Sequence, residues 1–238
     1  MMTRMATDAT VVLVHGAWHG AWCWRKVVPA LDDARVANVS IENPSVADAP
    51  ASLSDDIDRV RLALDAIDRP VVLVGHSYGG AVVTGAGTHD TVRHVVYLSA
   101  FALDEGESVM QNDLKGGEGT KLGDALAFDG DLIRFDPQRA IEFFYHDCTS
   151  ADAQSAVDEL KPMSAAAMAE PLGAVAWRAK PSTYVVCTDD RALPVRLQRS
   201  NAARVDDVRE MPTSHSPFIS RPDLVSELLI ELARSSRA

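Results

Sequence analysis

The segment that most restricts the fold of this chain is PVVLVGHSYGGAVVTGAG, at residues 70–87. Its first apolar run predicts a buried strand, and the small and apolar residues after the glycines predict a helix. A strand that turns directly into a helix lifts the residue between them above the sheet and brings its neighbours close together. Gly75, Gly79 and Gly80 leave room for such a turn around Ser77. The segment therefore predicts an α/β protein in which Ser77 stands exposed at one edge of a sheet.

The rest of the chain repeats this alternation of strand and helix. Short runs rich in β-branched residues alternate with apolar residues at helical spacing, which is typical of βαβ units and a parallel sheet. The predicted strands lie at residues 10–14, 36–41, 71–74, 93–98, 183–187 and 205–211. The predicted helices lie at residues 22–33, 54–67 and 222–235. Ser52 and Asp55 resemble a capping box ahead of the second helix, while Pro29 removes one hydrogen bond from the first.

Residues 104–180 interrupt this pattern. They begin with a polar, glycine-rich stretch and continue with short helical pieces around 137–147, 150–160 and 163–169, without an evident parallel strand. So long an insertion between two strands of a sheet favours a lid over a linker. We therefore expect a single domain over residues 1–238 that carries a helical lid.

Charge and cysteine content restrict the class of partner. The net charge is −11 and no basic stripe is present, so we expect neither nucleic acid nor an anionic membrane as a partner. No apolar run approaches the length of a membrane span, and the N-terminal run is too short for a secretory signal. Cys23, Cys148 and Cys187 lack metal-ligand spacing, which favours free thiols. These features predict a cytoplasmic protein without a metal or another cofactor, and they leave its oligomeric state open.

Ser77 is a candidate nucleophile. A phosphate-binding loop would need a lysine after its glycines and a dinucleotide site would need G-x-G-x-x-G, and the segment contains neither. A serine hydroxyl needs a general base, which in turn needs an acid to orient it. His215 follows the last predicted strand, at the carboxyl edge where open α/β sheets place their sites, and is the predicted base. Asp189 and Asp190 both follow the strand at 183–187, and periodicity does not separate them. The aspartate that is not the acid is expected to cap the next helix.

Five segments resemble one branch of a known superfamily. They are VVLVHGAWHGAWCW at 11–24, VGHSYGG at 74–80, VYLSAF at 96–101, YVVCTDDRALP at 184–194 and SHSPF at 214–218. Together they are similar to the methylesterase and hydroxynitrile lyase branch of the α/β hydrolases, in which the catalytic residues occur in the order Ser, Asp, His. The resemblance spans nearly the whole chain and is weakest in the predicted lid.

The resemblance implies a fold and a set of site residues. The fold is the α/β-hydrolase fold, with about six mainly parallel strands flanked by helices and a helical lid inserted before the last two strands. The resemblance favours Asp190 over Asp189 as the acid. It also implies an oxyanion hole formed by the backbone N–H groups of Ala17 and Tyr78.

The resemblance further implies a carboxylesterase or methylesterase that acts through an acyl-enzyme. A lyase of this branch carries a lysine after the catalytic histidine and a threonine after the first-loop histidine, whereas this chain has Ser216 and Gly16 there. Lyase chemistry, C–C hydrolysis, perhydrolysis and low-turnover ligand binding remain alternatives.

The substrate is predicted from the aromatic residues near these segments. No arginine cluster marks a site for an anion, so we expect a small to medium, neutral, apolar ester. Tyr78 and Phe144 are further candidates for the pocket lining. The residues chosen as substrate-binding are Trp18, Phe101, Phe143 and Phe218.

Overall fold

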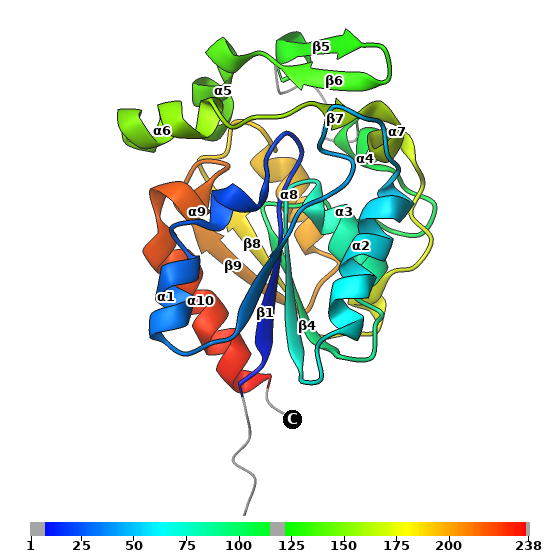
Figure 1. Ribbon diagram of the computed structural model, residues 1–238, viewed down its shortest axis with the longest axis vertical. Helices are drawn as coiled ribbons and strands as arrows, with labels where there is room; N and C mark the ends of the chain where they lie inside the picture. The colour runs from blue at the N-terminus through cyan, green and yellow to red at the C-terminus, as the bar shows by residue number, and fades with distance from the viewer. Residues whose placement is uncertain (1–7, 115–121, 237–238) are drawn as a thin grey trace, which may run out of the picture.

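A computed structural model describes residues 8–114 and 122–236 (Figure 1). Its centre is a six-stranded sheet in the order β2-β1-β3-β4-β8-β9, in which every neighbouring pair is parallel. The strands are β1 (Thr10–Val14), β2 (Asn38–Ile41), β3 (Val71–His76), β4 (Val92–Leu98), β8 (Ser182–Cys187) and β9 (Asp207–Met211). All six predicted strands are confirmed, with shifts only at their ends.

Helices cover both faces of this sheet. Figure 1 shows α2 and α3 on one side of the strands and α1 and α10 on the other. Because both faces are covered, β1 and β3 are buried along their whole length, which explains why they read as unbroken apolar runs. The helical elements around the main sheet are η1 (Ala21–Trp24), α1 (Val28–Asp33), α2 (Leu53–Asp65), α3 (Gly79–Ala86), α8 (Val195–Ala202), α9 (Pro217–Ser220) and α10 (Pro222–Ser235), and η3 (Ala176–Arg178) lies at the end of the insertion.

The first predicted helix is divided in two. Residues 22–33 were expected as one helix, but the chain forms the short η1 and then α1, with Pro29 in the first turn of α1. A proline has no N–H to donate and therefore fits a first turn, where that N–H has no partner in the helix. The proline thus marks where the second piece begins.

Between β4 and β8 lies the insertion, which we call the cap (residues 104–180). Its elements are α4 (Val109–Leu114), η2 (Gly123–Ala125), β5 (Leu126–Asp129), β6 (Leu132–Phe135), α5 (Pro137–Phe144), α6 (Ser150–Val157), β7 (Met163–Ser164) and α7 (Ala165–Ala169). β5, β6 and β7 form a separate antiparallel sheet that the sequence did not predict. Figure 1 shows this sheet together with α5 and α6 above one end of the main sheet.

The cap differs from the predicted helical lid because it contains an antiparallel hairpin, formed by β5 and β6. Four-residue strands are too short for a clear alternation of polar and apolar residues, and their turn depends on Gly130, which has a positive φ of 60°. The predicted helical pieces around 137–147 and 150–160 contain α5 and α6, whereas 163–169 begins as a strand. None of the helices in the described residues combines the length and the apolar composition required to cross a bilayer.

Candidate active site

Ser77 occupies a strained turn between β3 and α3. Its φ is +52°, in the left-handed region that side chains other than glycine rarely adopt. A Cβ on Gly75 would lie 2.4 Å from the carbonyl oxygen of Gly79, and a Cβ on Gly79 would lie 2.6 Å from that of His15. The two glycines are therefore required by close backbone contacts. The turn has the form that the sequence predicted.

His215 lies between β9 and α9 and makes a close pair with Asp190. Its Nδ1 is 2.7 Å from Oδ2 of Asp190, and both side chains are buried, with 4% and 0% of their surface exposed. When the carboxyl group is ionised, Nδ1–H donates to it and Nε2 is left as the acceptor. This arrangement gives His215 the tautomer that a general base requires.

Asp190 is held by further hydrogen bonds. Oδ2 also accepts from the Ser99 hydroxyl and, at 3.1 Å, from Nε2 of Gln198, while Oδ1 accepts from the backbone N–H groups of Ala192 (2.7 Å) and Leu193 (2.8 Å). Ser99 lies directly after β4, and Gln198 is on α8. These donors satisfy the buried carboxylate and fix its direction towards the histidine.

Asp189 lies differently. Its side chain is exposed, and its backbone carbonyl accepts from Nε2 of His146 at 2.9 Å. The prediction that Asp189, the aspartate that is not the acid, caps the next helix is wrong. Helix α8 begins at Val195, and its N-cap residue is Pro194, which forms no side-chain hydrogen bond to the helix. A loop of four residues separates the pair from the helix, so Asp189 does not reach its first turn. The geometry therefore favours Asp190 as the partner of the histidine.

Ala17 and Tyr78 both line the cavity that contains Ser77, and neither backbone N–H donates to an acceptor among the described residues. The loop that holds Ala17 lies very close to the serine, because a Cβ on Gly16 would be 2.8 Å from Cβ of Ser77. The position suits two donors that would stabilise a negatively charged oxygen.

The loop after β1 is fixed by His15. Nδ1 of this buried histidine lies 2.8 Å from the carbonyl oxygen of Gly16, and its Nε2 accepts from the backbone N–H of Asn43 at 3.1 Å. The side chain of Asn43 also donates to the His15 carbonyl at 3.0 Å. The histidine found by sequence in the first loop therefore holds that loop in place.

Two other buried histidines stand near the site. Nε2–H of His76 donates to the carbonyl oxygen of His215 at 2.8 Å, and burial lowers the pKa of His76 well below its ordinary value. His19 lies 2.8 Å from Ala17 O through Nδ1 and 2.8 Å from the Tyr145 hydroxyl through Nε2, and burial lowers its pKa to about 3. Both rings are therefore neutral near pH 7 and act as fixed hydrogen-bonding groups.

The cavity at Ser77 has a volume of about 40 Å³. Of the four predicted substrate-binding residues, Trp18 and Phe101 line it, and Phe143 and Phe218 do not. Phe218 is fully buried and packs 4.9 Å from the ring of Trp24, and Phe143 packs against Phe135 at 5.9 Å. Both therefore belong to the packed interior. Among the described residues, the lining is Ala17, Trp18, Ser77, Tyr78, Phe101, Asp113, Leu122, Phe144, Met168, Ala192, Leu193 and His215.

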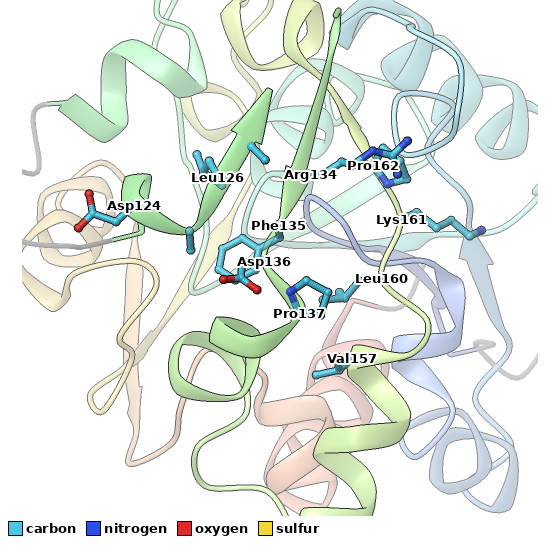
Figure 2. A pocket seen from close by; sticks show the side chains of 12 residues that line it. Asp124, Leu126, Arg134, Phe135, Asp136, Pro137, Val157, Leu160, Lys161 and Pro162 are labelled. Carbon is cyan, nitrogen blue, oxygen red and sulfur yellow. The ribbon is translucent and has the colours of Figure 1, made fainter. Parts of the chain in front are cut away.

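A larger hollow of about 500 Å³ lies in the cap (Figure 2). β5, β6 and residues 157–162 line it, and neither Ser77 nor His215 is among its residues. Phe135 lines this hollow and packs against two rings of the Ser77 cavity, with centroids 5.2 Å from Trp18 and 4.4 Å from Phe144. An aromatic wall (Trp18, Phe135 and Phe144) thus stands between the two spaces. We place the chemistry in the smaller one because it contains the serine and the histidine.

Sequence reasoning missed several residues of the site. Ser99 lies in a segment that carried the family resemblance, but nothing marked its hydroxyl as a partner of Asp190. Gln198, on the polar helix α8, and Asp113, in the polar start of the cap, gave no signal at all. Met168 and Leu193 are single apolar residues whose contacts depend on the tertiary fold.

Comparison with known proteins gives a family match over most of the chain. A family model described as "Alpha/beta hydrolase family" matches residues 11–228. The chain is 26% identical to "Alpha/beta hydrolase nvfD" of Aspergillus novofumigatus, over 92% of this chain and 94% of that protein. It is 28% identical to "Putative methylesterase 11, chloroplastic" of Arabidopsis thaliana, over 95% of this chain and 64% of that protein. Over a shorter stretch, 43% of this chain and 46% of the relative, it is 37% identical to a carbendazim hydrolyzing esterase of Nocardioides sp..

Solved structures show the same fold. A pyrethroid hydrolase from Sphingobium faniae JZ-2 superposes with a TM-score of 0.84 over 95% of this chain and 98% of that one, at 23% identity. Polyneuridine aldehyde esterase superposes with a TM-score of 0.82 over 95% of this chain and 100% of that one, at 22% identity. The predicted α/β-hydrolase fold and the resemblance to its methylesterase branch are confirmed.

Proposed function

The chain belongs to the alpha/beta hydrolase family, and we propose that it is a serine hydrolase that cleaves a carboxylic ester. One observation carries this proposal: a buried His215–Asp190 pair and a strained Ser77 share one cavity with two backbone N–H groups that lack acceptors among the described residues. Relatives named as esterases, among them methylesterase 11 and the carbendazim hydrolyzing esterase, support it.

Acylation follows from this arrangement. Oγ of Ser77 attacks the carbonyl carbon of the ester while Nε2 of His215 takes its proton, and Asp190 stabilises the imidazolium that forms. The negative charge on the carbonyl oxygen is held by the N–H groups of Ala17 and Tyr78. When the tetrahedral intermediate collapses, the C–O bond to the alcohol breaks, and His215 returns its proton to the departing alkoxide oxygen.

Deacylation repeats these roles with water. His215 takes a proton from a water molecule whose oxygen attacks the acyl carbon on Ser77. The bond to Oγ then breaks, Oγ takes the proton from His215, and the carboxylic acid leaves and ionises in water. No metal or cofactor is required for either half of the reaction.

The substrate we propose is a small to medium ester with a largely apolar body. Most of the cavity lining is apolar or aromatic, which suits burial of an alkyl or aryl group. A space of about 40 Å³ admits little more than water, so the cap side chains that line it, Leu122, Phe144 and Met168, have to shift when an ester enters. Because Ser216 carries no charge, the position after His215 supplies no cation to stabilise leaving cyanide, and we do not propose a lyase.

Replacement of the nucleophile tests the proposal. Ser77→Ala should lower kcat by roughly 10⁴–10⁶-fold, measured on a panel of methyl and p-nitrophenyl esters of increasing length with a cyanohydrin alongside. The melting temperature should stay close to that of the wild type, because one small hydroxyl contributes little packing. Ester turnover by Ser77→Ala within about tenfold of wild type would contradict the assignment.

Labelling separates an enzyme from a low-turnover ligand binder. A fluorophosphonate probe reacts only with an activated serine, so the wild type should be labelled and Ser77→Ala should not. Ser150→Ala, which removes an exposed hydroxyl on α6, is the matched control and should be labelled fully. An unlabelled wild type would favour the binder.

A further inference from the structure

Among the described residues, one carboxyl group lines the Ser77 cavity and has no role in the proposed reaction. It belongs to Asp113, on α4 of the cap. Apart from the serine, the histidine and Tyr78, the other side chains in the lining are apolar or aromatic. Asp113 is therefore the acidic side chain that an ester bound in this cavity would meet.

Hydrogen bonds from the neighbouring residue hold α4 in place. Asn112 is buried, and its Oδ1 accepts from Nδ2 of Asn201 at 3.1 Å. Nδ2 of Asn112 donates to Oε2 of Glu107 at 3.3 Å. Because Asn112 ties the helix to α8 and to the start of the cap, the position of Asp113 at the cavity is fixed by contacts other than its own.

Asp113 lacks a partner within residues 8–114 and 122–236. No described donor or cation forms a hydrogen bond or an ion pair with its carboxyl group, and burial raises its pKa. The contrast is Asp56, a buried acid on α2 whose carboxyl group accepts from the hydroxyls of Ser45 and Tyr78. A partly buried carboxylate without a partner is unfavourable, and a bound cation would remove that cost.

The charge around the site has the sign that attracts a cation. Within the described residues that line the cavity there is no lysine or arginine. The chain as a whole carries a net charge of −11, which raises the local concentration of cations and repels anions. A negatively charged substrate would meet no counter-charge from the described residues of this lining.

We propose that Asp113 binds a protonated amine carried on the apolar body of the ester substrate. This inference rests on the proposed ester hydrolysis. It refines the expected neutral, apolar ester to one that carries a cation on its apolar body. Trp18, Phe101 and Leu193 would contact the apolar part, and Asp113 would form a charge-assisted hydrogen bond with the ammonium group.

A pair of esters of equal length tests this specificity in the wild-type protein. Methyl 6-aminohexanoate carries an ammonium group near pH 7 where methyl heptanoate carries a methyl group. We expect kcat/KM to be at least about tenfold higher for the amino ester, the effect of one hydrogen bond to a charged group. Methyl 6-hydroxyhexanoate supplies a neutral donor, and equal preference for it would overturn the assignment of a cation.

Asp113→Asn identifies the residue responsible. This variant keeps the size of the side chain and removes its charge, so the ratio of kcat/KM for the amino ester to kcat/KM for methyl heptanoate should fall by about tenfold. Asp124→Asn, which changes a carboxyl group in the cap hollow of Figure 2, is the matched control and should keep the preference. An unchanged preference in Asp113→Asn would overturn the proposal.

The outcomes also separate this inference from the proposed function. If the wild type hydrolyses none of the three esters and resists the fluorophosphonate, the hydrolase proposal itself fails. If it hydrolyses the amino ester and methyl heptanoate equally well, only the cation site fails. Should Asp113→Asn not fold, competitive inhibition of the wild type decides: hexylammonium should inhibit at least about tenfold more tightly than 1-hexanol, and equal inhibition contradicts the site.

Discussion

At the scale of single residues, the two neighbouring aspartates after β8 have separate surroundings. Asp190 is buried against His215 at 2.7 Å, and the side chain of Asp189 is exposed. Backbone and side-chain donors hold the carboxylate of Asp190. In the described structure Asp189 forms hydrogen bonds only through its own backbone atoms. Substitution by asparagine therefore tests their roles without a change of size.

We expect opposite results from the two asparagine variants. Asp190→Asn should lower kcat by roughly 10²–10⁴-fold, because the imidazolium loses its counter-charge and the ring its preferred tautomer. Asp189→Asn should stay within about tenfold of wild type. Since Asp189 caps no helix, Asp189→Ala should also change the free energy of unfolding by less than about 0.5 kcal/mol. An inactive Asp189→Asn beside an active Asp190→Asn would refute the assignment of the acid but not the hydrolase itself.

The pH profile distinguishes the two histidines beside Ser77. His215 accepts a proton only when it is neutral, so kcat/KM, measured from about pH 9 to pH 5, should fall in a single step towards acid pH. Burial holds the pKa of His76 well below its ordinary value, so its ring stays neutral through the same range. His215→Gln should remove the step with most of the activity, while His76→Gln should retain the step. A rate that does not vary with pH would rule out this scheme.

At the scale of secondary structure, the capping box of α2 links a sequence pattern to stability. The Ser52 hydroxyl accepts from the backbone N–H of Asp55 at 3.1 Å, and the Asp55 carboxylate accepts from that of Ser52 at 2.8 Å. This confirms the predicted box. Ser52→Ala should lower the free energy of unfolding by about 0.5–2 kcal/mol, measured by urea denaturation, without a change in kcat. Ser150→Ala, which removes an exposed hydroxyl from the first residue of α6, compares the loss of a hydroxyl that is not at an N-cap, and an equal loss from both variants would argue against a capping effect.

The main sheet could be predicted from sequence because its strands are long and buried on both faces. β1 and β3 read as unbroken β-branched runs, and the turn at Ser77 needs glycines at fixed distances. The cap hairpin could not be predicted from sequence, since β5 and β6 have four residues each and half of these residues are exposed. Short strands owe their form to the tertiary contacts around them, which periodicity does not record.

The lining of the Ser77 cavity could also not be predicted fully from sequence. Phe101 and Phe218 look alike in sequence, yet the first lines the cavity and the second packs in the interior against Trp24. An aromatic residue buries equally well in a core or beside a ligand, so its type alone does not say which. Asp113 was missed for a different reason: a carboxyl group in a polar stretch is usually solvated, and only the fold brings this one to the serine.

At the scale of the whole molecule, the buried histidines make stability depend on pH. Burial lowers the pKa of His19 from 6.5 to about 3 and that of His76 in the same direction. Between pH 6.5 and about pH 3, His19 binds a proton in the unfolded chain but not in the folded chain. The free energy of unfolding therefore falls as the pH falls from 6.5 towards 3. Each such group contributes a slope of about 1.4 kcal/mol per pH unit in this window.

Urea denaturation at a series of pH values from about 7 to 4 measures this slope. His19→Gln should be less stable at neutral pH, because the contact with Tyr145 is altered, but its stability should fall less steeply in acid. His89→Gln, which changes a histidine beside Asp65 at the surface, should not make the slope shallower. If His19→Gln kept the wild-type slope, the burial of the His19 ring would not be the source of the acid sensitivity.

The aromatic wall also bears on how such a protein could diverge. Phe135 belongs to the cap hairpin and takes no part in the proposed bond breaking, yet its ring lines the hollow in the cap and packs against Trp18 and Phe144 of the Ser77 cavity. A smaller residue at that one position would leave room for Trp18 and Phe144 to move towards a hollow more than ten times larger than the cavity at Ser77. Descendants of this chain could therefore acquire bulkier substrates by drift at an outlying residue, while Ser77, Asp190 and His215 stay as they are.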